Sequence, residues 1–280
     1  MQYLLLITVI ILISLQNVFQ KQYNIKDERP NIFLFGAFSS ISALIFFVLS
    51  SGFKLNFTWE FVPYSVAFAI TYATASIGIV YAMRYGSMAI STLVISYSLL
   101  IPTAYGVIFV GDDIGYIAYI GIAMLLISIF LLNTNNGEIK FSFKWIIWLV
   151  VTFSGNGLCS TIQKMQQITF SGNYKNEFMI IALSISGVIL LIASIIQRGK
   201  CNIKACASLS IPSGFANGIV NLFVMLLTGS IPNAILFPSI SAGGIVLSFI
   251  IAIIVYKERL SKVQLAGYIL GISSIILLNL

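Results

Sequence analysis

The chain consists mainly of long apolar runs separated by short polar stretches. Of its 280 residues, 59% are hydrophobic and 8% are charged, whereas soluble globular domains carry about one-quarter charged residues. A transmembrane helix needs about 20 predominantly apolar residues. Ten runs approach this length, near residues 2–20, 31–51, 62–83, 87–110, 115–133, 145–164, 178–197, 208–228, 233–255 and 262–280. We therefore predict an all-α polytopic membrane protein with ten transmembrane helices.

The remaining composition excludes several kinds of partner and cofactor. The net charge of +7 could suggest nucleic acid, but the cations lie between apolar runs, where they reflect membrane topology instead. Histidine is absent and the three cysteines are odd in number, which argues against a metal site and against a disulfide framework. We expect the protein to bind no metal, no cofactor and no nucleic acid. We expect it to be a monomer or homodimer in the lipid bilayer.

The two halves of the chain resemble each other. Residues 111–133 align with 257–279, so that Gly121 meets Gly267 and Asp112 meets Glu258. Near the start of each half, the Gln-Lys pair at 20–21 aligns with the pair at 163–164. These coincidences predict two five-helix repeats, residues 1–134 and 135–280. Because five is odd, the second repeat must enter the membrane inverted, a plan that recurs in secondary transporters.

The positive charges are distributed unevenly between the alternate loops. Twelve of the 15 lysines and arginines fall in the five odd-numbered loops of the predicted topology, and the opposite side holds only Lys54, Lys164 and Lys175. Cytoplasmic loops carry the excess of positive residues. This bias predicts that the twelve-cation side faces the cytoplasm of a bacterial plasma membrane and that both termini lie outside.

The ends of both halves resemble a known family. The segment YGSMAISTLVISYSLLIPTAYGVIFVGDDI, residues 85–114, is similar to the end of one five-helix half in the EamA-like branch of the drug/metabolite transporter superfamily. The segment VYKERLSKVQLAGYILGISSIILL, residues 255–278, resembles the end of the other half. The resemblance implies transport of small metabolites through a central cavity lined by helices 1, 3, 4, 6, 8 and 9. Asp112 replaces the family's more usual glutamate, and that family is generally pictured with cytoplasmic termini.

Polar side chains within the apolar runs are the candidates for contact with a substrate, because such groups are costly in hydrocarbon and tend to face a bundle interior or a cavity. Several are spaced four residues apart, which places them on one face of a helix. Gln20 follows two of them on helix 1. Helix–helix hydrogen bonding is the alternative role for each group. The predicted substrate-binding residues are Gln16, Asn17, Tyr72, Ser76, Tyr97, Asn156, Ser160, Asn217, Asn221 and Ser241.

The sequence favours a carrier over an enzyme. No Asp, Glu, Lys or Arg falls near the middle of a predicted span, so we expect a neutral or zwitterionic small-molecule substrate. An enzyme would need an activated nucleophile, a carboxylate pair or a metal site within the membrane. We recognise none of these in the sequence. The main prediction is a secondary transporter working by alternating access. A lipid or lipid-precursor flippase or scramblase with the same fold remains the alternative.

Overall fold

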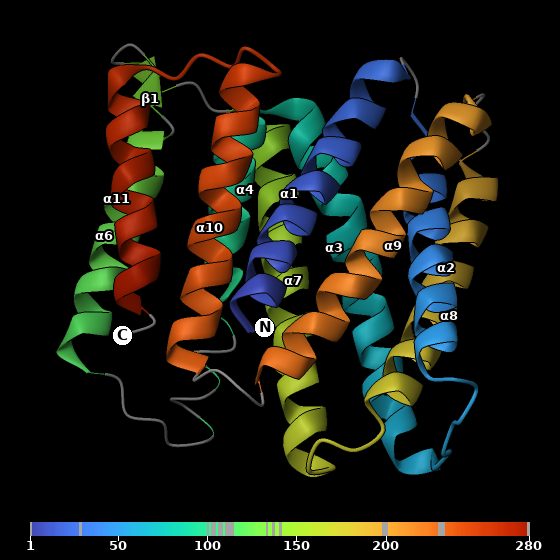
Figure 1. Ribbon diagram of the computed structural model, residues 1–280. Helices are drawn as coiled ribbons and strands as arrows, with labels where there is room; N and C mark the ends of the chain where they lie inside the picture. The colour runs from blue at the N-terminus through green and yellow to red at the C-terminus, as the bar shows by residue number, and fades with distance from the viewer. Residues whose placement is uncertain are drawn as a thin grey trace.

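The computed structural model describes residues 2–27, 30–99, 101, 105, 109, 115–132, 134–135, 138–139, 142–197, 201–228 and 233–278. These residues form a helical bundle (Figure 1). Its α-helices are α1 (Gln2–Lys26), α2 (Ile32–Ser50), α3 (Val62–Tyr85), α4 (Met88–Ser96), α6 (Tyr116–Leu132), α7 (Phe143–Thr169), α8 (Lys175–Ile196), α9 (Ile203–Thr228), α10 (Asn233–Ile254) and α11 (Lys262–Leu278). Each predicted apolar run overlaps one of these helices.

Short elements complete the described structure. The 3₁₀ turns η1 (Trp59–Phe61) and η2 (Tyr97–Leu99) precede α3 and follow α4. β1 (Thr134–Asn135) also pairs with β2 (Glu138–Ile139) as an antiparallel ladder of two residues each, and the fold class is all-helical, as predicted. α4 ends at Ser96 and η2 follows it. Most of the rest of the fourth predicted run, up to residue 110, lies outside the described residues. Asp112 lies outside the described residues.

Local sequence explains where several helices begin. The Asn31 side chain accepts a hydrogen bond from the Leu34 backbone N–H at 3.0 Å and caps α2. The Ser87 hydroxyl does the same for Ile90 at the start of α4. Proline in the first turn of α3 fits because the N–H it lacks has no partner there. At α2 and α4 the helix therefore starts where a side-chain cap satisfies a free backbone N–H group.

Six helical segments of the described chain are long and apolar enough to cross a membrane. They are Gln2–Lys26, Ile32–Ser50, Trp59–Tyr85, Phe143–Thr169, Lys175–Ile196 and Ile203–Val224, and shorter apolar helices occur at Ile240–Ile254 and Lys262–Leu277. Large apolar side chains are exposed along them, for example Ile7, Val188 and Ile269 at 54–59%. A helical protein with several such segments fits a membrane location.

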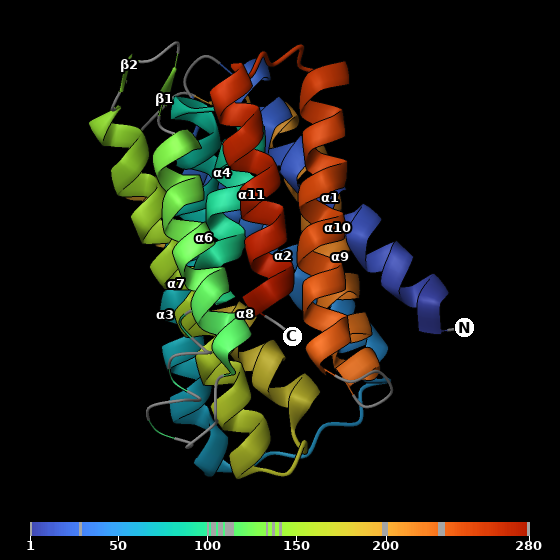
Figure 2. The same cartoon turned by 90° about the vertical axis from the view of Figure 1, so that its left-hand side faces the viewer.

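The helices pack in a row of pairs. In Figure 1, α6 and α11 lie side by side at one edge and α2 packs against α8 at the other. Between them, α1 packs against α9 and α10, and α3 packs against α7 and α8. The turned view in Figure 2 shows α4 between α6 and α7 on one side and the α10–α11 pair on the other. The helices between the two edges of the row, α1, α3, α4, α7, α9 and α10, come from both halves of the chain.

Glycine permits the close crossing of α3 and α7. A Cβ atom on Gly155 of α7 would lie 2.9 Å from the Ala75 nitrogen of α3, and one on Gly78 of α3 would overlap the Thr152 side chain of α7. Small residues allow helix backbones to approach closely in membranes. The α3–α7 contact therefore depends on two glycines, one from each half.

Candidate functional site

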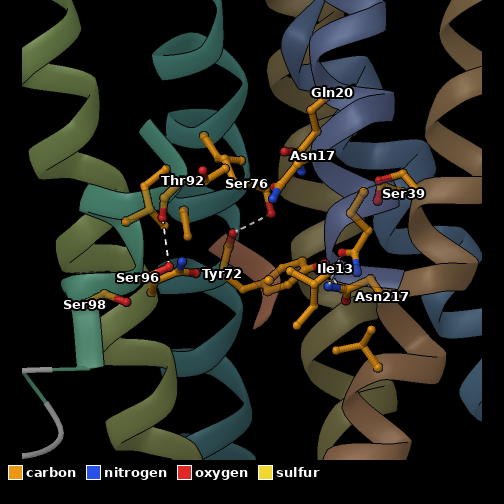
Figure 3. Close-up of a pocket in the computed structure, with 18 of the residues that line it drawn as sticks. Ile13, Asn17, Gln20, Ser39, Tyr72, Ser76, Thr92, Ser96, Ser98 and Asn217 are labelled. Carbon is orange, nitrogen blue, oxygen red and sulfur yellow. Dashed lines mark hydrogen bonds between the residues drawn. The ribbon is translucent and has the colours of Figure 1, made fainter. Parts of the chain in front are cut away.

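A cavity of about 310 Å³ lies between the helices at the centre of the bundle. Figure 3 shows side chains from α1, α3, α4, η2 and α9 around this space. None of the described residues that line it is charged. Its polar lining consists of carboxamides and hydroxyls: Gln16, Asn17, Gln20, Ser39, Tyr72, Ser76, Thr92, Ser96, Ser98, Asn156, Ser213, Asn217 and Ser241. The volume is at the lower end of the ~300–1,000 Å³ of typical ligand sites, so the cavity suits a small molecule.

The structure brings most of the predicted residues to this cavity. The ones that line it are Gln16, Asn17, Tyr72, Ser76, Asn156, Asn217 and Ser241. They come from α1, α3, α7, α9 and α10. Residues distant in sequence therefore share one polar space between the two halves.

Asn217 is the centre of a hydrogen-bond network that joins three helices. Its Oδ1 accepts a bond from the Tyr72 hydroxyl of α3 at 3.1 Å, and its Nδ2 donates to Gln16 Oε1 of α1 at 3.1 Å. Asn221, one turn further along α9, donates from Nδ2 to the Asn217 backbone oxygen at 2.9 Å and to Oδ1 at 3.2 Å. Gln16 Nε2 in turn donates to the Leu12 backbone oxygen at 3.3 Å. These amides hold the cavity wall in shape.

Asn17 and several hydroxyls are also paired within the protein. Asn17 Nδ2 donates to the Ser248 hydroxyl of α10 at 3.1 Å. Ser76 donates to the Tyr72 backbone oxygen and Ser96 to that of Thr92, both at 2.8 Å. A hydroxyl that donates to its own helix keeps lone pairs with which it can accept a bond. Ser76 and Ser96 can therefore accept a hydrogen bond from a molecule in the cavity.

Two carboxamides of the cavity differ from the rest. Asn156 of α7 has no side-chain hydrogen bond to another described residue, and Gln20 Oε1 of α1 is buried without a partner among the described residues. Most buried polar atoms in proteins are hydrogen-bonded. Asn156 therefore keeps hydrogen-bonding capacity for a molecule in the cavity, whereas Gln20 Oε1 is enclosed by the protein.

Three predicted residues lie outside the cavity lining. Tyr97 is 1% exposed, and its hydroxyl is 2.9 Å from the Ser128 hydroxyl of α6. Ser160 donates to the Asn156 backbone oxygen at 3.1 Å. Asn221 reaches the cavity only through Asn217. In this structure Tyr97 joins helices, and the other two hydrogen-bond to the backbones of cavity-lining residues.

The sequence prediction missed the contribution of α2. Phe35, Gly36 and Ser39 of this helix line the cavity, although the family resemblance implied no role for the second helix. The two adjacent serines, Ser39 and Ser40, were the polar residues that could have indicated this role of α2. Only Ser39 lines the cavity, because Ser40 is buried beside Ser186 of α8. Gln20 follows Gln16 and Asn17 on α1 and also lines the cavity, but it was not among the predicted binding residues.

An ion pair lies close to one end of the cavity. Lys21 Nζ, directly after Gln20, is 3.5 Å from Glu258 Oε1 and also donates to the Met83 backbone oxygen at 3.2 Å. Glu258 accepts bonds from the Ser87 hydroxyl at 2.7 Å and from the Met88 backbone N–H at 2.9 Å. The carboxylate thus caps the N-terminus of α4, where negative charge is favourable. It ties α1, α3 and α4 to the connection between α10 and α11.

Comparison with known proteins identifies the fold more closely than the function. No family profile matches the chain. An uncharacterized protein of Haemophilus influenzae (strain Rd) is 25% identical over 255 residues, which cover 85% of each chain. A protein with a known crystal structure superposes with a TM-score of 0.64 at 13% identity, covering 99% of this chain and 95% of the other. The chain therefore shares its overall fold with a protein of known structure.

Proposed function

We propose that this protein is a secondary transporter of small neutral or zwitterionic metabolites. The observation that carries the proposal is the central cavity, which is lined by amides and hydroxyls from both halves and by no charged side chain among the described residues. Such a lining can hydrogen-bond a polar solute but cannot neutralise a net charge. Binding between two halves of a bundle is the arrangement that alternating access requires.

The packing of the helices supports ten spans arranged as an inverted repeat. Under that plan α1, α2, α3, α4 and α6 correspond to α7, α8, α9, α10 and α11. If each helix is replaced by its counterpart in the other half, the packed pair α1–α9 becomes α7–α3. In the same way α2–α9 becomes α8–α3, and α1–α10 becomes α7–α4. All six of these pairs are in contact in the structure. The pairs α2–α8, α4–α10 and α6–α11 map onto themselves. This pattern fits two halves related by a pseudo-two-fold axis in the membrane plane.

The resemblance of residues 85–114 and 255–278 to EamA-like drug/metabolite transporters agrees with this proposal. The family resemblance and the packing pattern both imply a carrier made of two five-helix halves. The flippase alternative is less favoured by the cavity, since about 310 Å³ is small for a molecule with two acyl chains.

Transport by vesicles that contain the purified full-length protein tests the proposal. We expect saturable counterflow of at least one radiolabelled solute among glycine, L-alanine, L-leucine, L-glutamine and uracil. Asn156→Ala should reduce this counterflow, because Asn156 lines the cavity without a hydrogen-bond partner among the described residues. Leu158→Ala on the same helix serves as the matched control, since Leu158 is 44% exposed on the outside of the bundle.

Two results would contradict the proposal. Saturable transport of a permanent dication would be incompatible with an uncharged site. Transfer of a fluorescent phospholipid across the vesicle membrane, with no movement of any soluble solute, would favour the flippase instead.

A further inference from the structure

Two opposite charges hold the corner between α3 and α4, residues 83–89. Lys21 of α1 donates to two backbone oxygens at the C-terminal end of α3, that of Met83 at 3.2 Å and that of Gly86 at 3.4 Å. The C-terminal end of a helix carries partial negative charge, so a lysine is favourable there. This side of the corner is thus bound by a cation from another helix.

Glu258, in the connection between α10 and α11, binds the other side of the corner. It accepts bonds from the Ser87 hydroxyl at 2.7 Å and from the Met88 and Ala89 backbone N–H groups at 2.9 and 3.3 Å. These groups form the N-terminal end of α4, which carries partial positive charge. The carboxylate is also 3.5 Å from the Lys21 ammonium group. Each charge therefore binds both its own partner and the helix end of opposite polarity.

The ion pair and the corner are attached to different helix pairs. On the side of the ion pair, α1 is joined to α10, where Asn17 Nδ2 donates to the Ser248 hydroxyl at 3.1 Å. On the side of the corner, α4 is joined to α7, where Trp145 Nε1 donates to the Ser91 hydroxyl at 3.0 Å. Separation of α1–α10 from α4–α7 at this end of the bundle must therefore break the bonds between the ion pair and the corner.

The corner lies at one end of the central cavity. Ile79 and Thr92, each about one helical turn from the corner on α3 and α4, both line the cavity. The Thr92 hydroxyl donates to the Met88 backbone oxygen at 2.9 Å. Gln20, directly before Lys21, lines the cavity from α1. A movement of the corner away from α1 and α10 would therefore open the cavity at this end.

We propose that the α3–α4 corner is a gate of the cavity and that the ion pair of Lys21 and Glu258 is its latch. The inference rests on the proposed transport function, in which each end of the cavity must open in turn. The structure has the latch closed. The two side chains are 17% and 14% exposed, so water can replace their bonds to the corner when the gate opens.

Access of a reagent to the cavity tests the latch without a substrate. Ser76→Cys in a Cys201→Ser background reports on access, because Ser76 lines the cavity and the other two cysteines are buried. A charged, membrane-impermeant methanethiosulfonate is added to one face of sealed vesicles at a time. The face next to the corner is the one from which Lys262→Cys, at the exposed start of α11, is labelled. Glu258→Gln and Lys21→Met should each raise labelling from that face about tenfold, the effect of one lost charged hydrogen bond on the opening equilibrium.

The opposite face and a neighbouring arginine provide the controls. Labelling from the opposite face should not rise in either variant. Arg259→Gln, which removes a charge at the exposed position beside Glu258, should leave labelling from both faces unchanged. Two results would overturn the inference: an equal increase from both faces, which would show that the ion pair only stabilises the bundle, or unchanged labelling in both variants.

A crosslink tests the same gate during transport. The Ser87 and Glu258 side chains are in contact, so Ser87→Cys with Glu258→Cys can be joined by a short bifunctional methanethiosulfonate. The crosslink should stop counterflow until a reductant cleaves it, whereas Ser87→Cys alone should keep its counterflow after the same treatment. Continued counterflow through the crosslinked protein would overturn the gate and leave the carrier function intact. If the latch variants open one face but no solute crosses the vesicles, the gate holds and the proposed transport function is wrong.

Discussion

At the residue scale, Tyr97 shows how a polar group in a predicted span can be structural. Its hydroxyl is 2.9 Å from the Ser128 hydroxyl, and Ser128 donates to the Gly267 backbone oxygen of α11 at 2.7 Å. A Cβ on Gly271 would overlap the Tyr97 hydroxyl, so glycine makes room for this contact. The chain of bonds joins η2, α6 and α11.

Replacing Tyr97 with Phe should therefore reduce stability and leave solute binding intact. The change removes one hydrogen bond between helices, worth about 0.6–1.5 kcal/mol. Melting of the purified variant should show the loss. Unchanged stability, together with weaker binding of a transported solute, would instead show that Tyr97 is a substrate-binding residue.

Two glycines beside the cavity should tolerate alanine very differently. A Cβ on Gly214 of α9 would overlap the Ser39 backbone oxygen of α2, whereas one on Gly244 of α10 would meet only Ile13 Cγ2 at 3.6 Å. Gly214→Ala should force α2 and α9 apart and cost about 1–3 kcal/mol. Gly244→Ala should change the melting temperature little. Equal effects would show that the α2–α9 approach is not tight.

The separation of binding residues from structural ones was only partly predictable. Spacing along α9 correctly placed Asn217 and Asn221 on one helix face, but only Asn217 lines the cavity. Ser160 and Ser76 have the same local pattern, a hydroxyl bonded to the carbonyl four residues earlier, and only Ser76 lines the cavity. Which neighbour covers a helix face depends on tertiary packing, so a single sequence cannot distinguish such pairs.

At the element scale, α4 depends on an acid from a distant part of the chain. Glu258 accepts bonds from the N-terminal Met88 and Ala89 N–H groups at 2.9 and 3.3 Å and pairs with Lys21. Glu258→Ala should cost about 1–3 kcal/mol, because it removes a helix cap and leaves Lys21 without its carboxylate. Arg259→Ala, at an exposed neighbouring position, is the control.

A double-mutant cycle with Lys21→Met measures the coupling between the two side chains. Because either substitution already breaks the Lys21–Glu258 ion pair, the two single losses should not add. Strictly additive melting shifts would show that the ion pair contributes nothing.

Helix positions were predicted well, because each apolar run is bounded by polar or turn-forming residues. The runs near 62–83 and 178–197 differ from α3 and α8 by three residues or fewer at either end. The end of the fourth run lies largely outside the described residues, so its boundary stays a prediction. The place of α2 beside the cavity was also missed, because hydrophobicity alone does not say which helix borders which.

At the scale of the whole molecule, the cation-rich ends of the helices gather at one end of the bundle. In Figure 1 the C-terminal end of α1 and the α10–α11 connection lie at the top, while both chain termini are marked in the lower half. The positive-inside bias predicts that the upper end faces the cytoplasm.

Cysteine labelling checks this orientation. In a Cys201→Ser background, a membrane-impermeant maleimide should label Lys54→Cys on intact cells and Lys262→Cys only after the membrane is opened. Both positions are exposed, and the other two cysteines are buried. The opposite labelling pattern would place the termini in the cytoplasm.

Because no described side chain of the cavity is charged, a zwitterion would cross the membrane without net movement of charge. The membrane potential, worth about 2.3 kcal/mol per charge per 100 mV, could then do no work on the transported molecule. Unless an ion travels with the solute, its accumulation would follow concentration differences alone. Counterflow in vesicles should accordingly proceed at the same rate with and without an imposed potassium diffusion potential, and a carrier of this kind would serve a cell by releasing or exchanging what metabolism has already concentrated.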